Sequence, residues 1–458
     1  MRIAWRAAEL RMIVPLFLLV PLGFIVAHVA QTNEMTPGPL GLAFGYAALM
    51  LGAHLALAIA RHRGDQLLLP LVATIGGIGL VMLNRLPQEL AGTSALGIQI
   101  GMAGTQLLWF AVSVVAMLAV AIGLRDDGIL RHYKYTWAAA GAAALLATFL
   151  FGKEVNGARL WLDFGPVQVQ PGEFIKVVLV IFLASYLAER RTLLTDAFRQ
   201  FGPIGIPPIP YLLPMIAMFV AVMLIVVVSN DLGSALLFFG TFLTMLFVAT
   251  GRRSYVLLGL FLFVAGSFVA YQLFGHVERR VNTWLDPFAD PSDAGYQTVQ
   301  ALYAFARGGL FGEGLGQGMP PIGGALPIPF THTDFIFAAI AEELGLIGAF
   351  ALLALTAALV FRGLRIAVLA RDDFSSLLAV GLITSLGIQS LIIAAGNAKL
   401  VPLTGITYPF LSYGGSSLLA SFVMIGLLLS ISHRSSPEPM RDKAPRRRAP
   451  VAATGPAR

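Results

Sequence analysis

The sequence HVERRVNTWLDPFADPSDAGYQ at residues 276–297 begins the longest polar interruption in an otherwise apolar chain, and this interruption continues to His332. Apolar runs flank it on both sides, at residues 254–275 and 334–361. About 20 mostly apolar residues are needed to cross a hydrocarbon core about 30 Å thick. Residues 276–332 are therefore predicted to form a long loop between two membrane helices. The loop contains two Asp-Pro pairs and many glycines, and we expect the chemistry of the protein to occur there.

The composition predicts an all-α polytopic membrane protein. Of 458 residues, 57% are hydrophobic and 12% are charged, whereas an average soluble domain is roughly 25% charged. The chain has no cysteine, which excludes disulfides and thiolate metal sites. About twelve runs have the length of a transmembrane helix. They are residues 12–30, 38–60, 67–84, 105–124, 136–151, 171–188, 210–228, 232–250, 254–275, 334–361, 375–396 and 415–432.

The positions of Lys and Arg predict the orientation, because basic residues in short loops are retained on the cytoplasmic side. With the N-terminus inside, most of the 31 basic residues fall in cytoplasmic segments. We therefore expect both termini in the cytoplasm and the long loop outside the cell membrane. The net charge of +7 reflects this bias, so nucleic acid is not an expected partner. The basic, Pro-rich tail at residues 434–458 is predicted to be a disordered cytoplasmic segment.

Charged residues within apolar runs are candidate functional residues, since burying a charge in a membrane is unfavourable. Glu173 and Lys176 are three residues apart and share a helical face, where they can pair; alternatively, both extend to the membrane interface. Asp334, Glu342 and Glu343 lie in another apolar helix, and the spacing returns one glutamate to the face of the aspartate.

The polar segments outside the helices contain further candidates. Asp286 and Asp290 each precede a proline, a pattern that is typical of helix N-caps. The following segment, from Tyr296 to Ala306, has helical spacing and predicts a short helix that lies either on the membrane or against the protein itself. The glycines of GGLFGEGLGQG suggest mobility beside a substrate rather than a phosphate loop, because the Gly-Lys-Ser/Thr ending is missing. Asp231 is expected to cap the helix that follows it.

Three separated regions of the chain resemble one family, the SEDS proteins, which are the RodA and FtsW group of bacterial cell-wall glycosyltransferases. They are NGARLW with QPGEFIK at residues 156–176, DPSDAGYQ with TDFIFAAIAEELG at 290–297 and 333–345, and PLTGITYPFLSYGGSS at 402–417. The resemblance covers about residues 135–433. It implies a catalytic membrane core of ten helices, with residues 1–134 containing an extra N-terminal pair. The chain departs from the family at Gly172, where serine is common, and at Asp293, where small residues are common.

The resemblance implies that lipid II, an undecaprenyl-pyrophosphate-linked disaccharide pentapeptide, is polymerised on the outer face of the bacterial cytoplasmic membrane. Asp290 is the implied catalytic base, taking a proton from the attacking sugar hydroxyl. One carboxylate can suffice, because pyrophosphate leaves without being protonated. The negative charge of the leaving pyrophosphate must be stabilised by basic residues or by a divalent cation such as Mg or Mn. No ligands are assigned to such a cation. The candidate substrate-binding residues are Lys176, Glu173, Arg159, Arg307, Lys399, Asp334, Glu343 and Ser412.

The implied partners are a class B penicillin-binding protein with transpeptidase activity and the membrane lipid. Two other functions remain open at the level of the sequence: a transporter that moves lipid II between leaflets, and an inactive scaffold for the transpeptidase. The first is disfavoured because we find no duplication typical of transporters. The sequence WLDPFADP at residues 284–291 favours a role in elongation (RodA) over one in division (FtsW).

Overall fold

The computed structural model describes residues 6–35, 40–86, 101–319 and 326–436, with short gaps at 125, 127, 156–157, 166–167, 197–198, 202–203 and 207–208. Most of the predicted disordered tail, from residue 437 onward, lies outside this description. Asn156 and Gly157 of the NGARLW motif lie outside it as well.

Each of the twelve predicted spans coincides with a helix, because long apolar runs leave the backbone no partner in lipid other than itself. Ten spans in the described chain are long and apolar enough to cross a membrane. Of the other two, α4 is shorter, with 17 residues, and α9 has 20 residues whose side chains are described only in part. The spans are α1 (Ala7–Ile13) with α2 (Leu16–Thr32), α3 (Leu40–Ile59), α4 (Leu68–Asn84), α5 (Gly101–Gly123), α7 (Lys134–Phe151), α8 (Pro171–Asp196), α9 (Ile209–Val228), α10 (Leu232–Thr250), α11 (Arg253–Leu273), α14 (Ile336–Val368), α15 (Asp373–Asn397) and α16 (Gly415–Ser435).

The remaining elements are short and connect the spans. Helix α6 (Gly128–His132) precedes α7, and α12 (Gly275–Leu285), the 3-10 helix η2 (Pro287–Ala289) and α13 (Tyr296–Gly308) form most of the long loop. The strands β1 (Lys153–Val155), β2 (Ala158–Asp163) and β3 (Gln168–Val169) form an antiparallel sheet in that order, and β4 (Arg199–Phe201) pairs with β5 (Ile204–Ile206). These strands were not predicted from the sequence.

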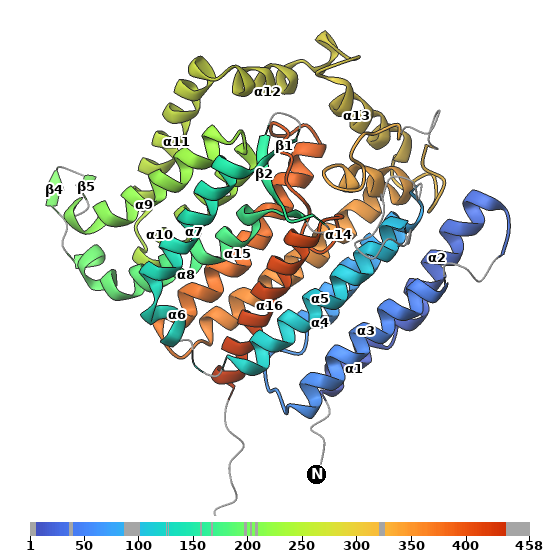
Figure 1. Ribbon diagram of the computed structural model, residues 1–458, viewed down its shortest axis with the longest axis horizontal. Coiled ribbons are helices and arrows are strands. Elements are labelled where there is room, and N and C mark those ends of the chain that lie inside the picture. The colour runs from blue at the N-terminus through green and yellow to red at the C-terminus, as the bar shows by residue number, and fades with distance from the viewer. Residues whose placement is uncertain are drawn as a thin grey trace, which may run out of the picture.

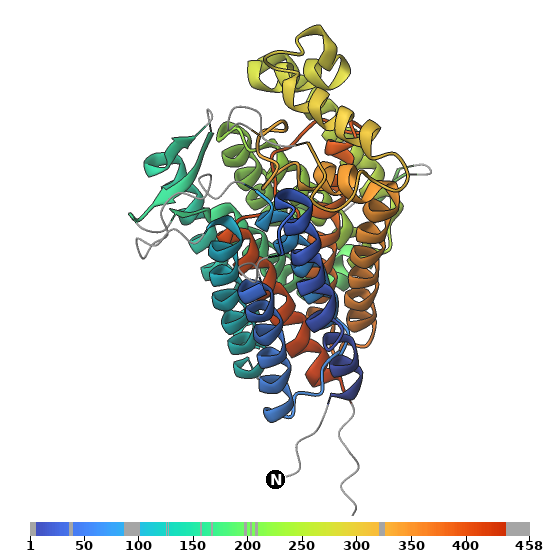
Figure 2. The ribbon, with the colours of Figure 1, turned by 90° about the vertical axis from the view of Figure 1, so that its right-hand side faces the viewer.

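The spans run side by side and separate two ends of the molecule (Figures 1 and 2). We call the end with α12, η2, α13 and β1–β3 the loop end. The opposite end, where α1 begins and α16 finishes, is the termini end. An even number of crossings places both termini on one side, as predicted. Helices α15, α8 and α16 are the most enclosed of these spans, with 83%, 78% and 78% of their apolar windows buried, whereas α11 has 0% and leaves its side chains for lipid.

Helix α13 confirms the helix predicted at residues 296–306, and it packs on its own protein. Its Ala301 and Ala304 are fully buried against Phe335 and Ala338 at the start of α14. The glycine segment that follows, residues 308–318, also lies close to α14. A Cβ at Gly312 would lie 2.1 Å from the carbonyl oxygen of Glu343. Close packing therefore requires a glycine at this position, a reason that the sequence alone did not indicate.

Gly312 provides a test of this packing, because its φ of +82° closely matches the +83° of Gly165, which has no neighbouring atom within 4 Å of a built Cβ. Gly312→Ala should destabilise the protein by about 2–4 kcal/mol through left-handed strain and overpacking. Gly165→Ala should show the strain alone, about 1–2 kcal/mol. Thermal denaturation of the purified variants measures both, and equal losses would show that the contact with α14 is unimportant.

Candidate active site

The two Asp-Pro aspartates of the long loop have different surroundings. Asp286 caps η2, since its Oδ1 accepts a hydrogen bond of 3.1 Å from the Phe288 N–H. This confirms the N-cap expected from the sequence. Asp290 accepts longer hydrogen bonds, of 3.3 and 3.4 Å, from the N–H groups of Asp293 and Ala294. Its carboxylate is exposed. It is thus positioned by the turn and remains open to a reactant.

The position of Gly295, four residues after Pro291, is explained by the geometry of the turn. Its N–H donates a 2.8 Å hydrogen bond to the carbonyl oxygen of Asp290. A Cβ at this position would lie 2.0 Å from the carbonyl oxygen of Pro287. The chain therefore folds back on itself between η2 and α13, and this turn presents the Asp290 side chain at the loop end.

A small cavity of about 60 Å³ lies beside this turn, between α12, α13 and the connection from α15 to α16. Its lining contains two cationic side chains, those of Arg280 and Lys399. Ala294, which donates to Asp290, also lines it. The Trp284 indole N–H donates to the Lys399 carbonyl oxygen at 3.1 Å and ties α12 to this connection. The volume suffices for only a few water molecules, so a larger ligand must bind at the mouth.

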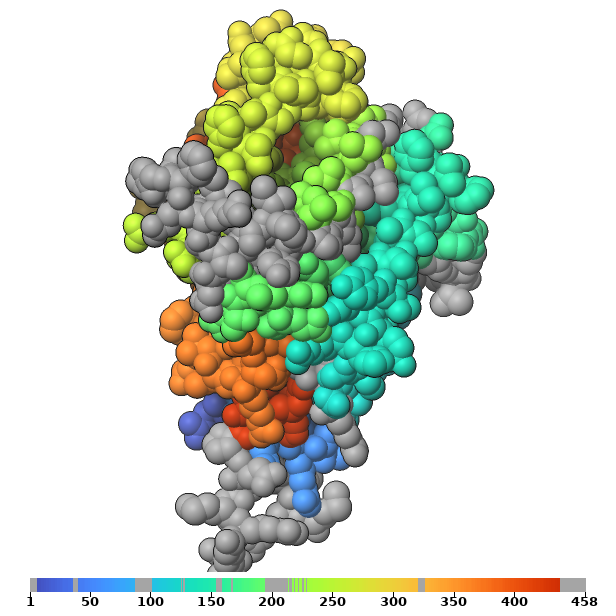
Figure 3. Space-filling model, turned by 90° about the vertical axis from the view of Figure 1, so that its left-hand side faces the viewer, coloured from blue at the N-terminus to red at the C-terminus, as the bar shows by residue number. Residues whose placement is uncertain are grey.

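The molecular surface is also hollowed below the segment that contains α12 (Figure 3). This hollow and the small cavity both belong to the loop end.

Arg280 interacts electrostatically with two carboxylates, Asp231 and Asp334. Burial lowers the pKa of the Arg280 guanidinium, and both carboxylates oppose this shift. Burial raises the pKa of Asp334 to about 6, while a hydrogen bond from Thr333 and the charge of Arg280 counteract the rise. Burial likewise raises the pKa of Asp231. The three side chains form an acid-base-acid cluster behind the cavity.

Asp231 is also the expected cap of α10, because its side chain accepts a 3.0 Å hydrogen bond from the Ser234 N–H. The sequence reasoning did not identify its proximity to Arg280 or the place of Arg280 in the site. The only local signal is that Arg280 is a second consecutive arginine on a loop helix next to a membrane span.

The predicted pairing of Glu173 with Lys176 is confirmed. The Lys176 Nζ lies 2.5 Å from the Glu173 Oε2, and both side chains are buried rather than extended to the interface. Lys176 also donates to the Gln389 Oε1 at 2.8 Å, and Gln389 donates to the Thr407 carbonyl oxygen at 2.8 Å. This network joins α8, α15 and the polar connection before α16.

Two glutamates of α14 hold the glycine segment and a neighbouring span. The Arg307 Nη2 lies 2.8 Å from Glu342, and the Arg85 Nη1 lies 2.5 Å from Glu343. Glu343 also accepts a 2.9 Å hydrogen bond from the Gly316 N–H. Arg307 and Glu343 were predicted to bind substrate; the structure places them in two separate ion pairs, and neither lines the small cavity.

The other predicted residues occupy distinct places. Arg159 lies exposed on β2. The Ser412 hydroxyl donates to the Thr333 carbonyl oxygen at 2.6 Å and accepts from the Tyr408 N–H at 2.8 Å, so it holds the connection against the residue before Asp334. Of the predicted set, Lys399 lines the small cavity, Asp290 is linked to it through the Ala294 N–H, and Asp334 interacts electrostatically with the lining residue Arg280.

The described residues do not form a complete binding site for a divalent cation. Within the residues described, no group of three His, Cys, Asp or Glu side chains is placed to hold a metal ion. The donor set that cations such as Mg²⁺ prefer is oxygen-rich and octahedral. No step below is therefore assigned to a metal.

Comparison with known proteins gives consistent relatives. The FtsW/RodA/SpoVE family model, described as "Cell cycle protein", matches residues 65–437, a range that contains the spans from α4 to α16. Peptidoglycan glycosyltransferase RodA of Mycobacterium tuberculosis (strain ATCC 25618 / H37Rv) is 42% identical over 438 residues, covering 94% of this chain and 92% of the relative. Stage V sporulation protein E of Bacillus subtilis (strain 168) is 36% identical, covering 72% and 86%.

Solved structures are also similar. A structure described as "Structural coordination of polymerization and crosslinking by a peptidoglycan synthase complex" matches with a TM-score of 0.63 at 27% identity, covering 82% of this chain and 99% of that one. The crystal structure of Rod shape determining protein RodA of Thermus thermophilus matches with a TM-score of 0.54 at 27% identity, covering 81% and 97%. The chain belongs to the FtsW/RodA/SpoVE family of multi-pass membrane proteins.

Proposed function

We propose that this protein is a peptidoglycan glycosyltransferase of the RodA type, which polymerises lipid II into glycan strands during cell elongation. Relatives that carry the name peptidoglycan glycosyltransferase RodA, at 42% identity over most of the chain, support this reaction. The observation that carries the proposal is the exposed carboxylate of Asp290 beside a cavity lined by Arg280 and Lys399. Transfer from a pyrophosphate donor needs a base for the acceptor hydroxyl and positive charge for the leaving group.

In the proposed reaction, Asp290 accepts the proton of the acceptor's 4-hydroxyl group. That oxygen forms a bond to the anomeric carbon of the donor, and the bond from this carbon to pyrophosphate breaks with inversion. The electron pair departs with the pyrophosphate, so no acid is needed. The weak backbone hydrogen bonds of Asp290 support its role as the base, because they leave lone pairs for the hydroxyl.

The leaving pyrophosphate gains negative charge, which Arg280 and Lys399 are placed to stabilise at the cavity. Between turnovers, Asp231 and Asp334 partly neutralise the positive charge of Arg280. The remaining substrate-binding candidates stay part of the proposal as residues around the sugar, phosphates or peptide. They are Lys176, Glu173, Arg159, Arg307, Asp334, Glu343 and Ser412.

The proposal places the loop end on the outer face of the cytoplasmic membrane and both termini in the cytoplasm. The concentration of arginines at the termini end supports this orientation. A class B penicillin-binding protein is the proposed partner, supported by the similarity to a peptidoglycan synthase complex. The exposed apolar surface of α11 offers a membrane span of that partner a place to pack.

Replacement of Asp290 tests the base directly. Asp290→Asn should slow polymerisation of labelled lipid II at least about a hundredfold, because an amide cannot accept the proton. Product ladders on a gel measure the rate, with the purified protein and its partner present.

Asp286→Asn is the matched control, since asparagine also caps a helix and should retain the parent rate within a few fold. Polymerisation at the parent rate by Asp290→Asn would refute the assignment of the base. Movement of lipid II between leaflets without any polymer would instead favour a transporter.

The buried pair of α8 requires two variants. Lys176→Met alone should destabilise the protein by about 3–5 kcal/mol, because Glu173 is left buried without its counter-ion. Adding Glu173→Gln should recover most of this loss, since no uncompensated charge remains. Thermal denaturation measures stability, and the polymerisation assay measures the role in substrate binding. A stable double variant with full activity would limit the pair to a structural role.

Asp334 makes stability depend on pH. Its folded-state pKa of about 6 lies above the ordinary value of 3.8, so the folded protein binds this proton more tightly than the unfolded chain does. The resulting stabilisation is complete below pH 4 and is lost as the pH rises through 6. It amounts to about 3 kcal/mol.

Denaturation midpoints measured from pH 4 to 7 should therefore fall more for the parent than for Asp334→Asn, which has no titrating group at this position. Parallel pH profiles of the two proteins would contradict the burial of this carboxyl group.

A further inference from the structure

A second and larger cavity opens at the termini end of the bundle, with a volume of about 410 Å³. The mechanism proposed for Asp290 makes no use of it. Its lining combines an apolar wall with a basic wall. The apolar wall is Ala60, Ala121, Ile122 and Leu124, and the polar and basic wall is His62, Arg63, Arg371, His433, Arg434 and Ser436.

Three arginines reach this cavity from separate parts of the chain. Arg63 lies between α3 and α4, Arg371 lies between α14 and α15, and Arg434 lies in the last turn of α16. None of the lining residues is acidic. Cytoplasmic retention of basic residues explains why arginines occur at this end, but it does not explain why three of them surround one cavity.

Four carboxylates close in sequence to the lining residues have other contacts, beginning with Asp126, which accepts a 2.9 Å hydrogen bond from the Gly128 N–H. Asp65 forms an ion pair with Arg362, and Asp373 forms one with Arg191 at 2.6 Å. Asp372 caps α15 by accepting a 3.0 Å hydrogen bond from the Ser375 N–H. Among the ion pairs of the described residues, none includes Arg63 or Arg371. Arg63 and Arg371 therefore bring positive charge to the cavity without an ion pair among the described residues.

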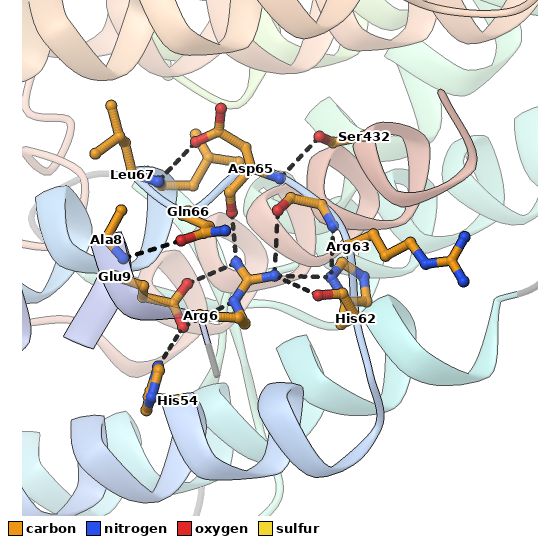
Figure 4. A network of polar contacts seen from close by, with 12 residues as sticks. Arg6, Ala8, Glu9, His54, His62, Arg63, Asp65, Gln66, Leu67 and Ser432 are labelled. Carbon is orange, nitrogen blue, oxygen red and sulfur yellow. Dashed lines mark hydrogen bonds and ion pairs between the residues drawn. The ribbon is translucent and has the colours of Figure 1, made fainter. Parts of the chain in front are cut away.

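The wall that carries Arg63 is held rigidly from the side of α1 (Figure 4). The buried Arg6 guanidinium donates to the carbonyl oxygens of His62 at 2.8 Å, Gly64 at 3.1 Å and Asp65 at 2.6 Å. Glu9 balances the charge of Arg6 at 2.6 Å. The connection between α3 and α4 thus keeps one conformation without any contribution from a ligand.

Helix α16 fixes the same connection from the other side. The Arg63 N–H donates to the His433 Nδ1 at 2.8 Å, and the rings of His433 and His62 stack with their centroids 4.6 Å apart. The Ser436 hydroxyl donates to the Arg63 carbonyl oxygen at 2.9 Å. Burial and the neighbouring His433 and Arg6 lower the pKa of His62 to about 3, so His62 is neutral at physiological pH. The positive charge of the cavity therefore belongs to its arginines.

We propose that this preformed cavity binds a phosphate group, and that the phosphate belongs to the head group of an anionic phospholipid. Guanidinium groups present paired N–H donors that match phosphate oxygens. The apolar wall comes from the ends of α3 and α5, where Ile122 is 39% exposed. Such a wall accommodates the glycerol and the first methylenes of a lipid. The cavity lies where spanning helices end, which is the depth of the head groups.

Native mass spectrometry of the full-length protein in detergent tests this site. The probes are phosphatidylglycerol, phosphatidylcholine as the zwitterionic comparison, and inorganic phosphate as the soluble competitor. We expect one phosphatidylglycerol to bind about tenfold or more tightly than phosphatidylcholine. Arg63→Gln with Arg371→Gln should reduce phosphatidylglycerol binding by about tenfold or more, because two charges that face the phosphate are removed.

Two further double variants keep the result interpretable. Arg63→Lys with Arg371→Lys retains the charge and should keep most of the binding, which separates loss of charge from damage to the fold. Arg11→Gln with Arg190→Gln removes the same charge from exposed positions outside the cavity and should leave binding unchanged.

Equal binding of the two lipids by the parent, or parent-like binding by the Arg63→Gln and Arg371→Gln variant, would overturn the proposal. Displacement of phosphatidylglycerol by millimolar inorganic phosphate would overturn the lipid as the source and identify a soluble phosphate compound instead. The measurement needs no turnover, so its failure leaves the proposed glycosyltransferase activity unaffected.

Discussion

The ion pair between Arg85 and Glu343 is the contact on which the architecture of the loop end depends. Glu343 is fully buried, and a carboxylate without a partner between membrane helices would be strongly unfavourable. Its second oxygen accepts the Gly316 N–H, so one side chain fixes α4, α14 and the glycine segment together. The neighbouring Glu342 forms an ion pair with Arg307 and so joins α13 to α14. Helix α13 in turn follows the turn that presents Asp290.

This arrangement distinguishes carboxylates that are buried in ion pairs from the exposed carboxylate of Asp290. Glu173, Glu342 and Glu343 are buried and matched by cations at 2.5 to 2.8 Å. Asp290 is exposed and accepts only backbone hydrogen bonds of 3.3 and 3.4 Å. A base must exchange its proton with a substrate, and strong internal partners would compete with that exchange. The weakness of its contacts is therefore consistent with a reactive role, whereas the buried pairs supply the rigidity that positions it.

Local patterns predicted the parts of this structure that local physics determines. Apolar runs gave all twelve helical ranges, the three-residue spacing gave the pair of Glu173 with Lys176, and the position of Asp231 before a helix gave its cap. Contacts between distant segments could not be read in this way. Arg280 reaches Asp231 and Asp334 across roughly 50 residues in each direction, and no periodicity encodes that meeting. The close approach of the glycine segment at residues 308–318 to α14 was not predicted, because it involves another segment of the chain.

The balance of charge at the two ends predicts how long a ligand remains bound at each. At the loop end, a phosphate that approaches Arg280 competes with Asp231 and Asp334, which already balance this cation. In the proposed reaction, that competition would weaken binding of the released pyrophosphate and so favour turnover. At the termini end, no lining carboxylate competes for Arg63 or Arg371. When a phosphate leaves this cavity, no lining carboxylate replaces its contacts with the arginines. The charges therefore favour a ligand that stays bound, as expected for a structural lipid and not for a reaction product.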